Sequence, residues 1–367
     1  MPIPSVNLKP CLDAAEPAWR ARLAAMFGRM HFILGEEVAG LEKELASAFQ
    51  TKCAITVGSG TAAIEIALRD AGVTRPSQEV WTTALTAPFT GVGIAAAGCR
   101  VRFADVDPET LLLDPADLGN RAGKRTAALV PVHLYGQPAP LAPFRSLARS
   151  LGAVLIQDAC QAHGATHKDK PLAAYGPYVC YSFYPTKNLG CLGDGGAITT
   201  NSLAAGKRLL SRRDGGRRGG QIAYLPGINS RLDEMQACYL RAFLPRLGEW
   251  NGMRRHVAHL YEEGLRDCPG IRPVRTSSES VRHLFVIRAA RRDKLRSWLA
   301  GKGIGTGIHY PAPLHLMPAF REAGCKRGDL PHAERAVREI LSLPIYPYLS
   351  DASVAEVIGR VREFYRR

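Results

Sequence analysis

Up to about residue 240, short runs of β-branched and apolar residues alternate with segments whose apolar residues recur at helical spacing. This alternation is typical of an α/β fold, in which a mostly parallel sheet is covered by helices on both faces. The small-residue-rich segment 86–98 is expected to be one of the covering helices. Strands are expected at residues 54–57, 79–81, 100–105, 128–132, 153–156, 179–183 and 197–200.

The pattern changes at Met235. Beyond this residue, apolar side chains recur every three or four positions between Trp250 and Leu265, which predicts a long helix. We expect this helix to bridge two domains. The large domain would comprise residues 1–245, and a smaller C-terminal domain would comprise residues 246–367.

The smaller domain is expected to be of the α+β type. Its predicted elements are a strand at 283–287, a helix around 295–299 that Gly301 ends, and a final amphipathic helix with apolar positions from Val354 to Phe364. A chain of 367 residues with 46% hydrophobic residues is long enough to bury the cores of both domains.

Composition and the N-terminal segment favour a cytoplasmic protein. The segment MPIPSVNLKPCLDAAEPAW lacks the basic start and apolar core of a secretory signal. No apolar run approaches the roughly 20 residues that span a bilayer, so no membrane partner is expected. The nine cysteines form no C-x-x-C pair and have no histidine at zinc-ligand spacing, which predicts reduced thiols and no metal site.

A net charge of +15 makes an anionic partner plausible, and nucleic acid, an acidic membrane and phosphorylated small molecules all qualify. No helix-turn-helix, zinc finger or aromatic-rich basic platform is present, so we expect no nucleic-acid partner. One glycine-rich basic cluster is expected to form a mobile loop, either solvated or in contact with phosphates of the substrate or partner subunit. It contains Lys207, Arg208, Arg212, Arg213, Arg217 and Arg218.

The first candidate for chemistry is a glycine-rich turn. An apolar strand ending at Val57 runs into Gly58, Ser59, Gly60 and Thr61 before a helical pattern begins. Free backbone N–H groups and the positive end of the helix dipole favour a phosphate at such a turn. Glycine-rich turns without a ligand are about as common, so this feature alone leaves both interpretations open.

Asp158 stands just past the carboxyl end of a buried strand, where α/β sheets hold ligands. One interpretation is a cap for the following turn. The other is a counter-ion to the protonated ring nitrogen of pyridoxal 5'-phosphate (PLP), which would keep the ring an effective electron sink.

Lys187 lies in a loop directly after a strand, within YSFYPTKNLG. Most lysines are solvated surface groups. A lysine held beside a cationic cofactor would lose its proton more readily, become a nucleophile able to form an imine, and serve as the base for a 1,3-proton shift.

The order of these segments, a phosphate turn, an aspartate at a strand end and a lysine after a later strand, is typical of PLP-dependent enzymes of fold type I. The sequence further resembles the DegT/DnrJ/EryC1/StrS family of sugar aminotransferases over nearly its whole length. The motifs that carry the resemblance are GSGTAAIEIAL, PVHLYGQPAPL, DACQAHGA, SFYPTKNLG, GDGGAITT, GINSRLDEMQACYL, GTGIHYPAPLHLMPAF and LSLPIYPYLS.

This resemblance implies an aminotransferase with a large domain built on a mostly parallel mixed sheet and a smaller C-terminal α+β domain. It implies that Lys187 forms the Schiff base, that Asp158 lies opposite the pyridine nitrogen, and that Gln161 lies close to the ring hydroxyl. The residues implied to bind the cofactor phosphate are Gly60, Thr61, Ala62 and Ser182.

The resemblance also implies a homodimer with shared active sites, because the asparagine of the family's G-x-N-x-R motif reaches the cofactor phosphate of the neighbouring subunit. Here that residue is Asn229. The residues implied to lie near the sugar and its diphosphate are Arg231, His309, Tyr310 and His315. For the two histidines, the alternative is a surface loop stiffened by prolines.

Two further positions lie close to the implied cofactor site. Members of this family usually carry an aromatic residue that stacks on the cofactor ring, but here the position is Ala87, and Phe89 is the candidate substitute. His163 follows Asp158 closely and is expected to pack near PLP, the alternative being a proton shuttle.

By resemblance, the amino donor is glutamate or glutamine and the acceptor is a nucleotide-linked keto-sugar. The C-terminal motif is most similar to members that act on 3-keto sugars linked to dTDP or UDP. Two alternatives stay open: a PLP-binding sugar dehydratase of the same fold, in which histidine replaces the lysine, and a non-catalytic regulatory protein, for which Ala87 is the only support.

Overall fold

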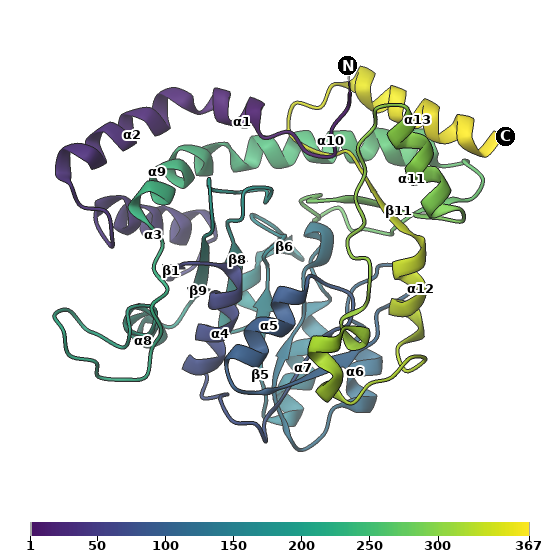
Figure 1. Cartoon of the computed structure of the whole chain (residues 1–367). Coiled ribbons are helices and arrows are strands. Elements are labelled where there is room, and N and C mark those ends of the chain that lie inside the picture. The colour runs from purple at the N-terminus through teal and green to yellow at the C-terminus, as the bar shows by residue number, and fades with distance from the viewer. Residues whose placement is uncertain (1, 367) are drawn as a thin grey trace.

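The computed structural model describes residues 2–366 and is built around a seven-stranded sheet with strand order β1-β9-β8-β5-β4-β2-β3 (Figure 1). Strand β9 runs antiparallel to both neighbours, and the other pairings are parallel. The seven strands that the sequence predicts are confirmed, and so is the mostly parallel sheet. Their bounds are β1 Cys53–Val57, β2 Glu79–Thr83, β3 Arg100–Ala104, β4 Thr126–Val130, β5 Val154–Asp158, β8 Tyr178–Ser182 and β9 Gly196–Thr200.

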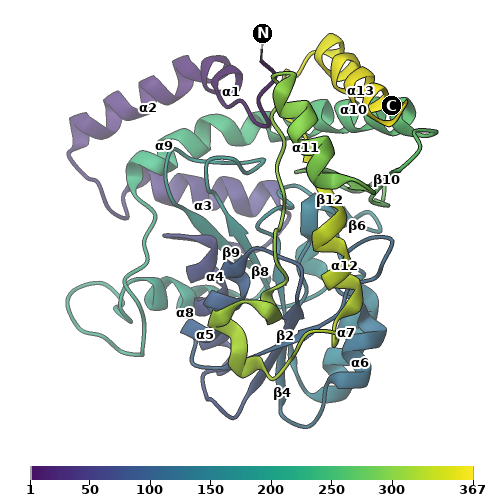
Figure 2. The same ribbon diagram turned by 45° about the vertical axis from the view of Figure 1, so that its right-hand side comes forward.

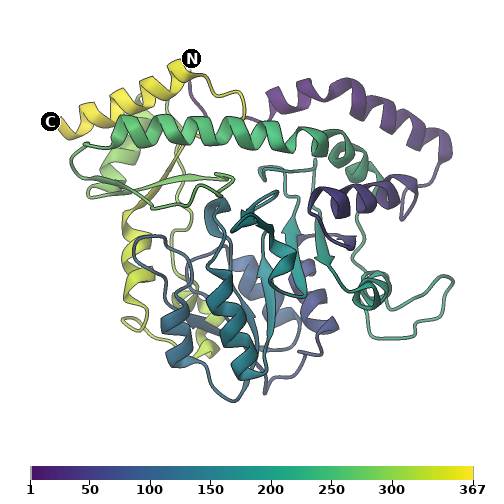
Figure 3. The same ribbon diagram turned by 180° about the vertical axis from the view of Figure 1, so that it is seen from behind.

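Helices cover both faces of this sheet, as Figures 1 and 3 show. Along β4, Ala128 and Val130 belong to the core cluster of one face, whereas Leu129 between them belongs to the cluster of the other. Successive side chains of a strand point to opposite faces, so a strand buried on both sides must be apolar throughout. The covering helices are α4 Gly60–Asp70, α5 Pro88–Ala96, α6 Pro115–Arg121, α7 Leu141–Leu151 and α8 Leu203–Arg213.

A second unit forms around the long helix α10, which crosses one end of the molecule beside α13 (Figures 1 and 3). Val257 and Leu265 of α10 pack with Val357 of α13 in one buried core. The predicted long helix and final helix are thereby confirmed. The elements of this unit are α10 Leu247–Leu265, β10 Ile271–Pro273, β11 Phe285–Ala289, α11 Arg292–Gly301, β12 Ile340–Leu343 and α13 Asp351–Arg366.

The start of the chain also joins this second unit. Ile3 forms a bridge with Ile304 and is buried in the same core as α10.

Helix α12 (Pro331–Glu339) lies along the side of the large sheet (Figure 2). The carboxylate of Asp105 fixes its first turn by accepting hydrogen bonds from the N–H groups of His332 (2.9 Å) and Ala333 (2.8 Å). The division into residues 1–245 and 246–367 stays a prediction.

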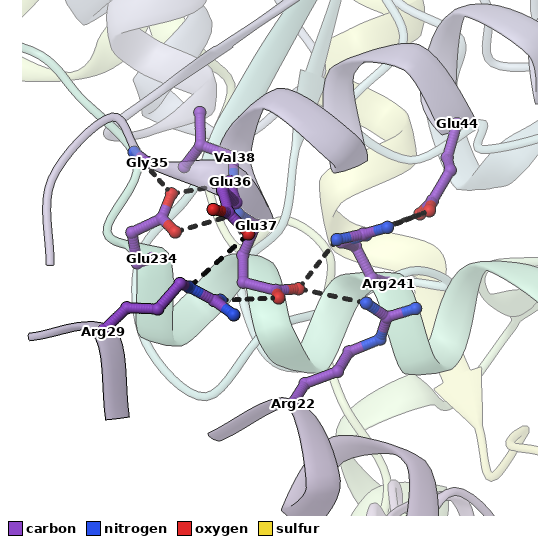
Figure 4. Close-up of polar contacts among 9 residues, drawn as sticks. All are labelled: Arg22, Arg29, Gly35, Glu36, Glu37, Val38, Glu44, Glu234 and Arg241. Carbon is purple, nitrogen blue, oxygen red and sulfur yellow. Dashed lines mark hydrogen bonds and ion pairs between the residues drawn. The ribbon is translucent and has the colours of Figure 1, made fainter. Parts of the chain in front are cut away.

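The N-terminal helices are attached to α9 by a buried charge cluster (Figure 4). The carboxylate of Glu234 accepts hydrogen bonds from three N–H groups at the start of α3, those of Gly35 (2.8 Å), Glu37 (2.9 Å) and Val38 (2.8 Å). This contact caps α3 and fixes the start of α9. The remaining helices and strands are α1 Lys9–Ala14, α2 Glu16–Arg29, α3 Glu36–Ala48, β6 Thr166–His167, β7 Lys170–Pro171 and α9 Glu234–Phe243.

The expectation that the basic cluster forms a loop is wrong for its first part, because Lys207 to Arg213 lie on α8. Arg208 and Arg212 both form ion pairs with Asp70, at 2.8 and 3.0 Å. Only the part beyond α8 is loop, and it projects from the body of the molecule in Figure 1.

Within residues 2–366, no helix is long and apolar enough to cross a membrane. All nine cysteines are free in the structure, and their reduced state stays a prediction. Five of them are buried, which agrees with the behaviour of cysteine as a small hydrophobic side chain.

Candidate active site

The three predicted chemical segments meet at one edge of the sheet. Strands β1, β5 and β8 run in the same direction, so their carboxyl ends lie side by side. Between this edge and the second unit is a cavity of about 680 Å³. The predicted cofactor residues that line it are Gly60, Thr61, Phe89, Asp158, Gln161, Ser182 and Lys187. The predicted substrate residues that line it are His309 and Tyr310.

Lys187 comes from the loop after β8. Its N–H donates to the carbonyl of Tyr184 at 2.9 Å, which closes a tight turn. Gly190 packs closely against this turn, because a Cβ there would collide with the Pro185 carbonyl oxygen. Burial lowers the pKa of the Lys187 amine, and within residues 2–366 the amine has no ion-pair partner. A larger fraction of this amine is therefore uncharged and nucleophilic than for a surface lysine.

Asp158 ends β5 and is 4% exposed. Its Oδ1 accepts from the N–H of Cys160 at 3.0 Å, which is the turn-capping contact expected of an aspartate at this place. Its Oδ2 accepts from the hydroxyl of Thr90 at 2.8 Å. No cation pairs with this carboxylate in the described part of the chain, so the cavity is suited to a ligand with a positive charge at this point.

The glycine-rich turn leads into α4. The Ser59 hydroxyl caps the helix by accepting from the N–H of Ala62 at 3.1 Å, so this N–H is engaged within the chain. The N–H groups of Gly60 and Thr61 find no acceptor among residues 2–366. A Cβ on Gly60 would lie 2.7 Å from the Ser182 Cβ, so only glycine lets the helix start approach β8 this closely. The turn presents two free donors to an anion.

Gln161 and Tyr310 form a polar pair across the cavity. The amide of Gln161 accepts from the N–H of Tyr135 at 2.7 Å and donates to the Tyr310 hydroxyl at 2.8 Å. The Tyr310 hydroxyl proton therefore remains available to a ligand. His309 contacts the Ser342 hydroxyl at 2.8 Å, and burial lowers its pKa to about 4, so its ring is neutral near pH 7.

The sequence alone did not identify His283, which also lines the cavity. Both amide hydrogens of Asn188 are used, toward Asn251 (2.8 Å) and the carbonyl of Val281 (2.9 Å). The Asn188 oxygen must therefore accept from Nδ1–H of His283 at 2.9 Å, which leaves the lone pair on Nε2. Burial, reinforced by the charges of Lys187 and Arg254, holds the pKa of His283 well below its usual value.

Two predicted residues are buried elsewhere. His163 packs against the rings of Tyr181 and Phe183, and burial lowers its pKa to about 3. This agrees with packing near the site. His315 is fully buried and contacts Glu334 at 3.1 Å, away from the residues that line the cavity. The structure thus contradicts both the surface loop and direct substrate contact within this chain for His315, because α12 covers its ring.

Asn229 and Arg231 also lie outside the cavity of their own chain. They belong to the segment between α8 and α9, where Asn229 is exposed and Arg231 forms an ion pair with Asp214 at 3.0 Å. The segment ends at Glu234, whose cap on α3 anchors it. Its two predicted site residues are therefore held at the surface.

The position of the missing aromatic residue is at the start of α5. Ala87 precedes that helix, and both Ala87 and Phe89 line the cavity. The Phe89 side chain is 63% exposed. Thr90, one residue further, donates its hydroxyl hydrogen bond to Asp158. In the sequence, only its place in the first turn of the predicted helix pointed to it.

Comparison with known proteins gives a consistent result. The model of the DegT/DnrJ/EryC1/StrS aminotransferase family matches residues 16–362. A pleiotropic regulatory protein of Geobacillus stearothermophilus is 40% identical over 370 residues, covering 100% of this chain and 99% of that protein. A dTDP-3-amino-3,4,6-trideoxy-alpha-D-glucose transaminase of Streptomyces venezuelae is 39% identical over 367 residues, covering 100% of this chain and 97% of that protein.

The crystal structure of S. venezuelae DesV in complex with a ketimine intermediate matches with a TM-score of 0.97 and 39% identity. The match covers 100% of this chain and 99% of the DesV chain. The likeness therefore includes the large sheet, the cavity and the second unit together.

Proposed function

The chain belongs to the DegT/DnrJ/EryC1/StrS aminotransferase family, and on this premise we propose that it transfers an amino group from glutamate or glutamine to a nucleotide-linked keto-sugar with PLP as cofactor. One observation carries the proposal. Lys187, Asp158 and the free N–H groups of Gly60 and Thr61 converge on a single cavity of about 680 Å³.

The residues present fit PLP. The start of α4 offers two free N–H donors to a phosphate, and the end of β8 adds the Ser182 hydroxyl. The Asp158 carboxylate, buried without a cation, would hold a protonated pyridine nitrogen. The Lys187 amine, with its lowered pKa, would hold the carbonyl carbon. Each of the three polar ends of PLP thus has a chemically matched group in this cavity.

PLP, when bound, supplies a carbonyl carbon that takes up the amino group and a ring that withdraws electrons from the carbon losing its proton. Lys187, released by the incoming amine, would be the base that holds the donor's α-proton during the 1,3-proton shift. Thr90 fixes the Asp158 carboxylate by its hydroxyl, and Gln161 and Tyr310 provide hydrogen-bond donors on the other side of the cavity. Burial of these groups keeps water from competing with them.

The acceptor class follows from the relatives. The S. venezuelae transaminase named above carries a dTDP-linked 3-amino sugar in its name, so dTDP-linked 3-keto sugars are the first candidates, with UDP-linked ones second. The cavity can take an anionic group on its Arg254 side, because Arg254 lines it and has no carboxylate partner among residues 2–366.

We include in this proposal a homodimer whose active sites are shared. Asn229 and Arg231 lie outside their own cavity on a surface segment that also exposes Ile222 (63%) and Tyr224 (59%). Exposed apolar side chains in one segment are typical of an interface. Mixing two inactive variants, Lys187→Ala and Asn229→Ala, tests it: mixed dimers would regain activity because one of their two sites is intact. Mixtures that stay inactive would contradict shared sites.

A regulatory role is the second candidate, because the Geobacillus relative is named a pleiotropic regulatory protein. Purified protein separates the two. An aminotransferase shows a visible absorption of bound cofactor that changes on adding glutamate, whereas a non-catalytic protein does not respond. The sugar dehydratase is disfavoured by Lys187, since those relatives carry histidine at this position.

The decisive test is a panel of keto-sugar nucleotides. Purified holoenzyme, glutamate or glutamine, and dTDP- or UDP-linked 3-keto and 4-keto sugars are incubated, and the amino sugar is detected by mass spectrometry. We expect the largest kcat/KM with a 3-keto sugar. Turnover of free keto acids only, with no nucleotide sugar accepted, would contradict the proposed function.

A further inference from the structure

Arg254 on α10 is a buried cation without an acidic partner. It is 4% exposed, and within residues 2–366 no carboxylate pairs with it. The other two buried arginines differ: Arg213 pairs with Glu42, and Arg288 pairs with Glu339 at 2.7 Å. Burying an unpaired charge is costly, so a cation left open in this way calls for a ligand to compensate it.

The guanidinium of Arg254 has one occupied side and one open edge. Its Nη1 donates to the backbone carbonyls of His283 (3.2 Å) and Ile345 (3.1 Å). Its Nε has no partner, and no contact engages its Nη2 in the described part of the chain. The Nε–Nη2 edge is the one that receives a carboxylate in a bidentate pair. Arg208 holds Asp70 with this edge, at 2.9 Å from Nε and 2.8 Å from Nη2.

Arg254 lines the same cavity as Lys187, and its unpaired Nε is itself buried. The pKa of His283 is lowered by the charges of both side chains, so the ring lies near each cation. Among residues 2–366, no carboxylate of the cavity takes this place. Asp158 is held by Thr90 and Cys160. Asp194, which also lines the cavity, forms no ion pair with Arg254. Burial also lowers the pKa of Arg254 to about 10, so the side chain remains charged near neutral pH.

We propose that Arg254 binds the α-carboxylate of the amino-acid donor while the donor's amino group reacts at the Lys187 position. This inference rests on the proposed function and names a binding residue for one of its two substrates. An α-amino acid carries its amino group and carboxylate on one carbon, so a single small molecule can engage two cations of one cavity. A dTDP-linked 3-keto deoxysugar, the first candidate acceptor, has no carboxylate, and its diphosphate is several bonds away from the reacting carbon.

The two halves of the reaction separate this role from a structural one. Stopped-flow absorbance follows L-glutamate reacting with the holoenzyme, and a second experiment follows the dTDP-linked 3-keto sugar reacting with the aminated enzyme. We expect Arg254→Gln to lower the second-order rate constant of the first by about 100-fold, the scale of a charge-assisted bidentate pair. The rate constant of the second should stay near that of the wild type.

Donor selectivity gives a sharper readout. The wild type should strongly prefer L-glutamate over 4-aminobutyrate, which lacks the α-carboxylate, and in Arg254→Gln this preference should collapse. Calorimetry adds a measurement that needs no turnover, because 2-oxoglutarate should bind the wild-type holoenzyme far more tightly than the variant. If Arg254→Gln folds poorly, Arg254→Lys, which keeps the charge but cannot form a bidentate pair, takes its place in the same measurements. Arg255→Gln, at an exposed neighbouring position, is the matched control and should behave as the wild type.

Equal loss in both half-reactions would overturn the inference in favour of a structural role. Loss in the sugar half-reaction alone would overturn it in favour of diphosphate binding. An unchanged preference for glutamate would also overturn it. A wild type that reacts with glutamate but with no keto-sugar would contradict the proposed function while the donor experiments still decide the role of Arg254.

Discussion

The charge cluster around Glu37 and the cavity around Lys187 are both buried, but they are built in opposite ways. Glu37 is 5% exposed and receives three arginines, Arg22 at 3.1 Å, Arg29 at 3.0 Å and Arg241 at 2.9 Å (Figure 4). In the cavity, Lys187 and Arg254 have no carboxylate partner, and the Asp158 carboxylate has no cation.

The contrast teaches how to distinguish structural from functional charge in this fold. A buried charge whose partners are all present holds elements together, as the cluster around Glu37 holds α2, α3 and α9. Charges whose partners are missing add free energy to the empty protein and are offset when a ligand supplies the partners. Cofactor and substrate are the groups expected to do so here.

Removal of the reacting amine should have the largest effect. Lys187→Ala removes both the covalent attachment and the base, so we expect transamination to fall by roughly 10³-fold or more. Steady-state amino-sugar formation measures this. Lys170→Ala, an exposed lysine outside the cavity, is the control. Activity of Lys187→Ala near that of the control would show that the open charges of the cavity serve another purpose.

Neutralising the carboxylate of the cavity should have the next largest effect. Asp158→Asn keeps the shape and the contact to Thr90 but cannot hold a proton on the cofactor ring, so kcat should fall by about 10²-fold or more. The free energy of unfolding without cofactor should change little or rise, because an unpaired buried charge is removed. A large loss of stability with unchanged kcat would place Asp158 with the structural charges.

The cluster around Glu37 should respond in the reverse manner. Glu37→Gln removes a buried carboxylate that three arginines share, so the free energy of unfolding should fall, by up to about 3 kcal/mol because Arg241 keeps Glu44 and Arg29 keeps Glu36. Glu36→Gln, whose side chain is 74% exposed, is the control and should change it little. Denaturant titration measures both. If kcat of the folded Glu37→Gln enzyme drops while stability is kept, the contrast fails.

His163 should give the smallest effect at neutral pH, and its effect on stability should grow as the pH falls. Its pKa is about 3 in the folded protein and about 6.5 when unfolded. The unfolded chain therefore binds the extra proton first, so stability is full above pH 6.5 and falls by about 1.4 kcal/mol for each unit below it until pH 3. His163→Phe, or His163→Leu if phenylalanine is too large, should weaken this fall. Melting temperatures between pH 7 and 4.5 measure it.

Activity of the same variant distinguishes packing from proton transfer. A ring that only packs against Tyr181 and Phe183 should be replaceable with little change in kcat near pH 7. A large loss of kcat with the melting temperature retained would instead support the proton shuttle.

Local patterns were sufficient to predict the scaffold and the reacting groups. Runs of apolar and β-branched residues marked all seven strands, as expected for a sheet that is covered on both faces. Lys187 and Asp158 could be placed because parallel strands bring their carboxyl ends to one edge, wherever those strands lie in the sequence.

Contacts between distant segments could not be predicted. Thr90 reaches Asp158 across 68 residues, and Arg254 looked like one of many cations on an amphipathic helix. The basic cluster was assigned to a loop because its glycines are typical of loops, but Asp70 accepts two of its arginines from 138 and 142 residues away. Which charges find partners is decided by tertiary structure, and this is the property that separates the two regions.

The most direct test of the central claim is chemical trapping. Purified holoenzyme is reduced with borohydride, digested, and analysed by mass spectrometry for a phosphopyridoxyl group. We predict that the group is found on the peptide that contains Lys187, and that it is absent when glutamate is added before reduction. A label on another lysine, or none in protein that has been supplied with PLP, would contradict the account.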